Sequence, residues 1–247
     1  MRKTLKVLSA LLTYPTAELQ AAMPELRYAL AADGALRGRQ QDRLDRIMEE
    51  IASGDLYDCQ ERYILLFDRT RSLSLHLFEH VHGESRDRGQ AMVDLAAHYR
   101  SHGVEVAANE LPDYLPMFLE FMSLIPAAEA QSLIGETSHV LEAIRQRLKK
   151  RKSSYSSVFS GVLALADIPI SKAIAAAVAG ETDDDPNDLA ALDKAWMDEE
   201  VLFGPSALSC GKDDLSAKLR AGRRPAPGMP EQQPKRPVVT VNGSVRR

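Results

Sequence analysis

The sequence predicts an all-α protein, made of a single-domain helical bundle followed by a disordered basic C-terminal tail. Alanine and leucine dominate the apolar residues, while aromatic residues make up only 6% of the chain, a composition that favours helices over strands. Apolar residues recur three and four positions apart through most of the sequence, whereas strand-like character is confined to a brief patch at residues 238–241. We expect one helical domain over residues 1–205 and a disordered tail over residues 206–247.

The first two helices have clear boundaries. Leucines at positions 5, 8, 11 and 12 indicate a helix that ends at Tyr14-Pro15. Thr16 is a suitable N-cap for a second helix that runs to the Asp33-Gly34 turn, and Pro24 predicts a kink or a broken first half within it. Further helical segments are expected over residues 44–54, 55–67, 72–81, 92–103, 117–125, 133–148, 155–166, 170–178 and 189–200.

One of these segments is expected at the centre of the bundle. The stretch 109–116 holds two prolines and an acidic residue before an apolar run, which is typical of a rigid helix entry. The helix that follows, over residues 117–125, is apolar on nearly all sides, and Pro126 ends it. The basic run at 147–152 complements the dipole at the end of the next long helix, so it needs no nucleic-acid partner to explain it.

Charge and cysteine content restrict the class of protein. Residues 216–247 carry eight Lys or Arg and one acidic residue, whereas residues 1–215 carry 23 basic and 34 acidic residues. Two cysteines without CxxC spacing favour a reducing compartment, and neither a signal peptide nor a membrane-spanning apolar run is apparent. We therefore expect a cytoplasmic protein that is not inserted directly into a membrane. A regulator that binds nucleic acid through its basic tail stays an alternative.

The stretch Phe78–Met92 differs from the plain helical pattern around it. It gathers histidines, acids, arginines and glycines between two helices, with Gly83 at a helix C-terminus and Asp87 at the next helix start. Loops of this kind carry binding chemistry, since an arginine fork can hold a carboxylate or phosphate at two points. The alternative is that these charges pair with one another and fix the loop.

Catalytic motifs are scarce. His76, Glu79 and His80 form an HxxEH pattern that would place both imidazoles on one helix face, so a metal-dependent hydrolase is the alternative function. A third ligand is not evident, and the chain contains no P-loop, GxGxxG or GxSxG. A groove for an amphipathic peptide is the stronger expectation, because aromatic residues accompany the charged loops. These aromatic residues are Tyr63, Phe67, Phe78, Tyr114, Phe118 and Phe121.

Residues 77–95, LFEHVHGESRDRGQAMVDL, resemble the signature of the NarJ family, the assembly chaperones or delta subunits of respiratory nitrate reductase. Tyr63, Leu66–Arg69, Ser74-Leu75 and Glu110–Pro116 fit the same pattern, and the resemblance covers about residues 1–205. It implies an all-helical protein that is not an enzyme and that binds the immature catalytic subunit, including its N-terminal peptide. That binding would keep the subunit off the membrane and permit insertion of molybdenum cofactor and iron–sulfur centres.

The resemblance also suggests where a partner binds. The wider group of molybdoenzyme chaperones carries Glu-Pro-x-Asp-His at a recognition loop, and the matching residues 110–114 place Tyr114 where that motif has histidine. The expected partners are the apo catalytic (alpha) subunit or alpha–beta complex and proteins of molybdenum cofactor biosynthesis, with no nucleic acid and no tightly held metal or cofactor. The residues expected to contact the partner peptide are Tyr63, Phe78, His82, Glu84, Arg86, Asp87, Arg88, Pro112, Asp113, Tyr114 and Phe118.

Overall fold

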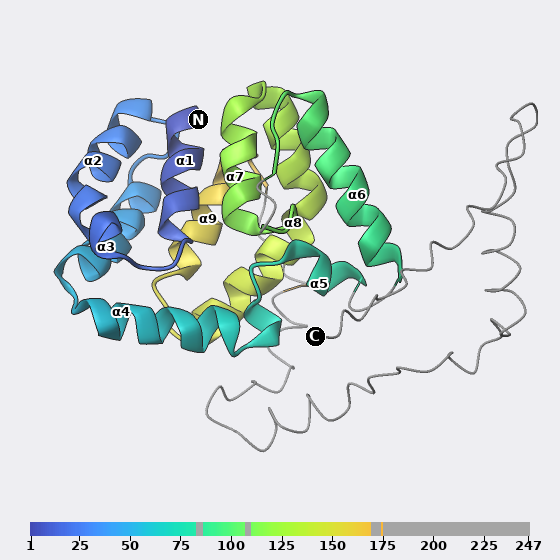
Figure 1. Cartoon of the computed structure of the whole chain (residues 1–247). Helices are drawn as coiled ribbons and strands as arrows, with labels where there is room; N and C mark the ends of the chain where they lie inside the picture. The colour runs from blue at the N-terminus through green and yellow to red at the C-terminus, as the bar shows by residue number, and fades with distance from the viewer. Residues whose placement is uncertain (83–85, 107–109, 169–173, 175–247) are drawn as a thin grey trace, which may run out of the picture. The chain divides into compact units, whose positions relative to one another are not determined.

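The computed structural model describes residues 1–82, 86–106, 110–168 and 174, and the regular elements within this part of the chain are helical (Figure 1). The all-α prediction is confirmed, and the described residues belong to one compact unit. The expected domain boundary at residue 205, the helices expected over 170–178 and 189–200, and the tail over 206–247 lie outside the described residues. None of the described helices is long and apolar enough to cross a membrane.

Local sequence signals set the ends of the first four helices. In order along the chain these are α1 (Arg2–Leu11), α2 (Ala17–Asp33), α3 (Arg39–Ser53) and α4 (Leu56–Tyr63). The Thr16 side chain accepts a hydrogen bond from the backbone at the start of α2, and Gly34 ends that helix in the left-handed conformation, with φ of 62°. The expectation of a broken first half is wrong, because α2 continues through Pro24.

The chain after α4 is less regular. The helix widens into a π-helical turn over Ile64–Asp68, and a 3-10 turn follows at Arg71–Leu73 before α5 (Leu77–His82). The single short helix expected over residues 72–81 is therefore divided in two. The Ser74 hydroxyl accepts a hydrogen bond from the His76 amide between the two pieces, at 3.2 Å, so this serine stabilises the turn.

Four more helices complete the described part of the chain. These are α6 (Arg86–Ser101), α7 (Leu115–Leu124), α8 (Ala127–Lys150) and α9 (Ser156–Leu165). The helix expected to begin at Asp87 begins one residue earlier, and Pro116 stands in the first turn of α7 as expected.

The core forms where α1 lies against α7, with α2 and α9 packed beside α1 and α8 packed on α9 (Figure 1). Three leucines of α1, at positions 5, 8 and 11, and the C-cap Leu12 are completely buried, and each such side chain stabilises the fold by about 2 kcal/mol. Helix α7 is buried over most of its length, which agrees with its expected central place. Gly161 of α9 allows close approach, since a Cβ there would lie 3.2 Å from Leu36 Cδ1.

Candidate functional site

The start of α5 and the start of α7 are joined by a short antiparallel bridge between His76 and Tyr114. The Leu115 amide donates to the Leu75 carbonyl at 2.8 Å, and the Leu77 amide donates to the Asp113 carbonyl at 3.1 Å. This bridge brings the 110–114 motif against the segment that precedes α5, two regions almost 40 residues apart in the sequence.

Asp113 secures the bridge from inside. Its side chain is completely buried, and its carboxylate accepts hydrogen bonds from the Phe78 amide at 3.1 Å and from His76 Nδ1 at 3.3 Å. The hydrogen bond to Asp113 raises the pKa of His76 and outweighs the opposing effect of burial. The His76 ring lies 5.4 Å from the Tyr114 ring, centroid to centroid.

A hollow of about 310 Å³ opens above this bridge. Its buried wall includes Tyr63, which donates its hydroxyl proton to the Leu12 carbonyl at 2.8 Å. Because the Tyr63 hydroxyl proton is already donated to Leu12, the Tyr114 hydroxyl is the donor in the 3.3 Å contact between the two tyrosine oxygens. Burial raises the pKa of both tyrosines, so both stay neutral near pH 7. The hollow is lined by Tyr14, Tyr63, Phe67, Asp68, Leu75, His76 and Tyr114.

A second hollow, of about 450 Å³, shares Tyr14 with the first. Tyr14 is 42% exposed and rests edge-on against the Tyr63 ring at 5.6 Å, so it presents an apolar face to solvent where the two hollows meet. The second hollow is lined by Tyr14, Tyr57, Asp58, Gln60, Glu61, Ile64, Leu65 and Arg69. We call the two hollows together the Tyr14 groove; its acids are Asp58, Glu61 and Asp68, and its bases are Arg69 and His76.

The π-helical turn forms much of the groove wall. Residues 64, 65, 67 and 68 all line one of the two hollows, and all belong to the five-residue segment Ile64–Asp68. Single π-turns inside helices are rare and occur often at functional sites. Here the turn lets one short segment supply both buried aromatic surface, from Phe67, and an exposed carboxylate, from Asp68.

Comparison with known proteins gives the family. Residues 15–160 match the family described as nitrate reductase delta subunit. The chain is 40% identical to the nitrate reductase molybdenum cofactor assembly chaperone NarJ of Escherichia coli K12, over 87% of this chain and 91% of that protein. The chain belongs to the nitrate reductase delta subunit family. It is also 37% identical to the probable chaperone NarW of the same strain, over 87% and 90% of the two chains, and 29% identical to a probable NarJ of Bacillus subtilis, over 71% and 95%.

The residues expected from the family resemblance fall into three groups. Tyr63 and Tyr114 line the Tyr14 groove. Asp113 accepts hydrogen bonds at the bridge, and the Pro112 carbonyl accepts one from the Tyr99 hydroxyl. The remaining expected residues with described side chains lie elsewhere: Phe118 is a buried core residue of α7, Phe78 is half-buried in α5, and Arg88 of α6 pairs with Glu79 at 3.2 Å. The side chains of His82, Arg86 and Asp87, and the whole of Glu84, lie outside the described part.

Sequence reasoning missed Tyr14, Tyr57 and Asp68 as groove residues. Tyr14 had been assigned only to a helix end, yet its position directly before Pro15 keeps it out of a helix and leaves the ring on the surface. The aromatic pattern did identify Tyr63 and Tyr114, because tyrosines beside charged loops are suited to a half-buried wall. Nothing in the local pattern indicated that α4 would widen at Ile64.

The hydrolase prediction is wrong for this family member. His76 precedes α5, whereas His80 lies within it, so the two histidines do not both belong to the helix. His76 binds Asp113, His80 Nε2 donates to the Ser74 carbonyl at 2.8 Å, and Glu79 pairs with an arginine. Burial lowers the pKa of His80 and keeps it neutral. All three side chains are therefore engaged within the protein, and they converge on no shared ligand position.

A larger hollow, of about 880 Å³, lies between α3, α4, α8 and the start of α9. It adjoins the Tyr14 groove, because Asp58, Glu61 and Leu65 line both. Seven arginines or lysines line it against three acids, and five serines, at 153, 154, 156, 157 and 160, complete much of the wall. Its positive lining disfavours a basic peptide, so the smaller Tyr14 groove is the better candidate for the partner peptide that the family resemblance implies.

Proposed function

We propose that this protein is a dedicated chaperone that binds the immature catalytic subunit of respiratory nitrate reductase and permits insertion of its molybdenum cofactor. The observation that carries the proposal is the 40% identity to NarJ of Escherichia coli K12, which extends over nearly the full length of both chains. Insertion of iron–sulfur centres, cytoplasmic location and contact with cofactor biosynthesis proteins are part of the same proposal.

We further propose that the Tyr14 groove holds the N-terminal peptide of that subunit. An amphipathic peptide with arginines needs apolar surface for one face and carboxylates for the other. The groove offers Tyr14 and Tyr57 as exposed aromatic faces, and Asp58, Glu61 and Asp68 as acids. The excess of acidic residues over positions 1–215 would also attract a basic segment before contact.

In this proposal Asp113 affects peptide binding indirectly and forms no salt bridge with the peptide. Its carboxylate is fully buried and already accepts two hydrogen bonds, so a peptide arginine meets the exposed acids of the groove first. Asp113 instead fixes His76 and the α5 start, which form one end of the groove wall. Its effect on peptide affinity would act through that placement.

Peptide calorimetry tests the groove. The probe is a synthetic peptide of the catalytic subunit's first few dozen residues. Tyr14→Ala removes the exposed ring where the hollows meet and should weaken binding about tenfold, since a central aromatic anchor contributes 1–2 kcal/mol or more. Tyr28→Ala is the matched control, because Tyr28 is 75% exposed on α2 and lines neither hollow of the groove. Equal affinity for both variants would remove the groove from the proposal.

A charge-reversal pair tests the acids. Asp68→Lys should weaken peptide binding several-fold, with the difference from wild type shrinking at high salt. Glu120→Lys makes the same charge change at an exposed position of α7 outside the groove and should leave affinity close to wild type. A loss of the same size in both variants would show a general charge effect rather than a local one.

The chaperone role itself is tested in cells that lack their own chaperone. Co-expression with the reductase subunits should restore molybdenum in the purified reductase, measured by elemental analysis, together with nitrate reduction. The groove variants should restore less. Full reductase activity and molybdenum content in the absence of this protein would contradict the proposed function, whatever the peptide experiments show.

A further inference from the structure

Two histidines at the C-terminal end of α6 lie close to a glutamate at the start of α8. His98 lies in the last turn of α6, His102 directly follows that helix, and Glu129 lies in the first turn of α8. Glu129 Oε1 is 3.1 Å from His102 Nε2 and 3.7 Å from His98 Nε2, and the three ligand atoms lie within 4.8 Å of one another. Phe121 of α7 supports both rings at centroid distances of 5.4 and 5.5 Å.

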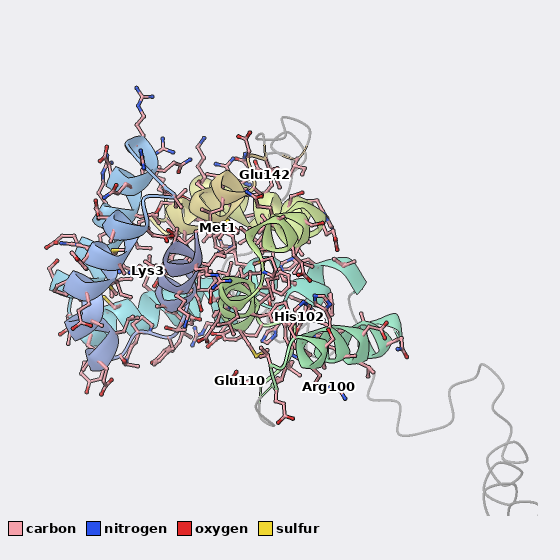
Figure 2. The ribbon with its side chains drawn as sticks, turned by 90° about the horizontal axis from the view of Figure 1, so that it is seen from above. Met1, Lys3, Arg100, His102, Glu110 and Glu142 are labelled. Carbon is pink, nitrogen blue, oxygen red and sulfur yellow. The ribbon has the colours of Figure 1, made fainter. Side chains whose placement is uncertain are left out.

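The surroundings of the rings show which nitrogen faces the cluster. His102 Nδ1 lies 3.1 Å from the His98 backbone carbonyl, which can only accept, so Nδ1 carries the hydrogen. His102 Nε2 is thereby directed at the Glu129 carboxylate. In Figure 2, Arg100 extends away from the helices, whereas His102, just after α6, lies on the side that faces α7.

The second ring adds an independent sign that a ligand belongs here. His98 Nε2 is buried, yet it has no hydrogen-bond partner. A neutral His102 ring with its hydrogen on Nδ1 would place the lone pair of Nε2 against the Glu129 carboxylate oxygen, which is repulsive. A cation between these atoms removes that conflict, either as a second proton on His102 or as a metal ion bound by both rings and the carboxylate.

We propose that His98, His102 and Glu129 form a binding site for a divalent late transition-metal ion of the Zn²⁺ class. Two histidines four residues apart at the end of a helix suit such an ion, and a backbone carbonyl that fixes the second ring nitrogen is the usual support for a histidine ligand. Tetrahedral Zn²⁺ bonds of 2.0–2.1 Å separate neighbouring ligands by about 3.3 Å, close to two of the observed separations. Calcium and magnesium are disfavoured, because they prefer sites made wholly of oxygen.

The site differs from the metal chemistry considered in the sequence. The HxxEH pattern falls within five consecutive residues, 76–80, and the sequence predicts no tightly held metal. The His98 cluster instead needs a glutamate 27 residues further along the chain. Three protein ligands leave a fourth position for water or a partner group. A bound ion would fasten the end of α6 to the start of α8 across Phe121.

The test is metal titration of the full chain, without a polyhistidine tag and after treatment with a chelator. Zn²⁺ is measured by competition with a chromogenic chelator, and Co²⁺ by its visible absorption. We expect one equivalent bound, with affinity reduced at least about tenfold in His98→Gln, His102→Gln and Glu129→Gln. Affinity should also fall below pH 6, where protons compete for the rings.

Two controls separate this site from incidental binding. His139→Gln removes an exposed histidine of α8 outside the cluster and should bind Zn²⁺ as wild type does. Glu129→Gln changes no ring packing, so it tests the site even if a histidine variant fails to fold. Zn²⁺ should raise the melting temperature of wild type but not of Glu129→Gln. The proposal is overturned by the absence of stoichiometric binding, or by binding that Glu129→Gln and His102→Gln leave unchanged.

Discussion

Replacing Asp113 by alanine should destabilise the fold substantially, because a fully buried carboxylate holds two donors there. The Phe78 amide would lose its acceptor, and leaving a buried donor unsatisfied costs about 1–3 kcal/mol. The His76 imidazole would lose a hydrogen bond as well. We expect a combined loss of about 3 kcal/mol in the free energy of unfolding, which for a domain of this size lowers the melting temperature by roughly 6–12 °C.

Urea denaturation followed by circular dichroism measures this loss, and two variants calibrate it. Asp113→Asn keeps one oxygen acceptor for the Phe78 amide, so it should lose only about 1 kcal/mol. Glu110→Ala changes an exposed acid three residues away and should stay within about 0.5 kcal/mol of wild type. An Asp113→Ala protein as stable as Glu110→Ala would refute the reasoning that the bridge depends on this carboxylate.

Histidines 76 and 80 should give opposite pH effects in urea denaturation between pH 5 and 8. The pKa of His76 is raised by Asp113, so its contribution is full below its ordinary value of 6.5 and disappears as pH rises through the raised pKa; His76→Gln should abolish that loss. The pKa of His80 is lowered by burial, so its contribution is present above pH 6.5 and disappears as pH falls through the lowered pKa, and His80→Gln should abolish that loss. Arg145→Ala should cost about 3–5 kcal/mol, because it leaves Glu142 buried and unpaired by a cation, whereas replacing both residues by leucine should recover most of that loss. Gly54→Ala should cost about 1–3 kcal/mol in the same assay, since its Cβ would stand 2.7 Å from a backbone carbonyl oxygen.

The helix boundaries show what local sequence can predict. Thr16 and Gly34 act through a hydrogen bond or backbone freedom within a few residues, so the sequence predicted their roles, and the structure has each at an end of α2. Pro24 shows the limit of the same approach. A proline inside a helix removes one hydrogen bond, but tertiary packing of Met23 and Leu30 against the core maintains α2 across it.

The candidate sites depend on contacts that local patterns do not contain. Tyr63 and Tyr114 could be selected by residue type, but their hydroxyl contact joins positions 51 residues apart. His76 was assigned to a helix because its spacing to His80 is four, while Asp113, 37 residues later, determines its actual place. The Tyr14 groove was missed for the same reason, since its walls come from the end of α1, the π-helical turn and the motif before α7.

The bridge between His76 and Tyr114 also joins the two ends of the intervening chain, so that this chain forms a closed loop with the bridge as its anchor. Loosening that anchor favours opening of α5 and α6 together, because both helices lie between its two ends, although Tyr99 of α6 still packs on Phe121 of α7 with ring centroids 4.4 Å apart. Amide hydrogens of the two helices should therefore exchange as one cooperative group, ahead of α1 and α7. Since His76 and Tyr114 are also groove walls, an occupant seated there would slow that opening and protect a region it never touches.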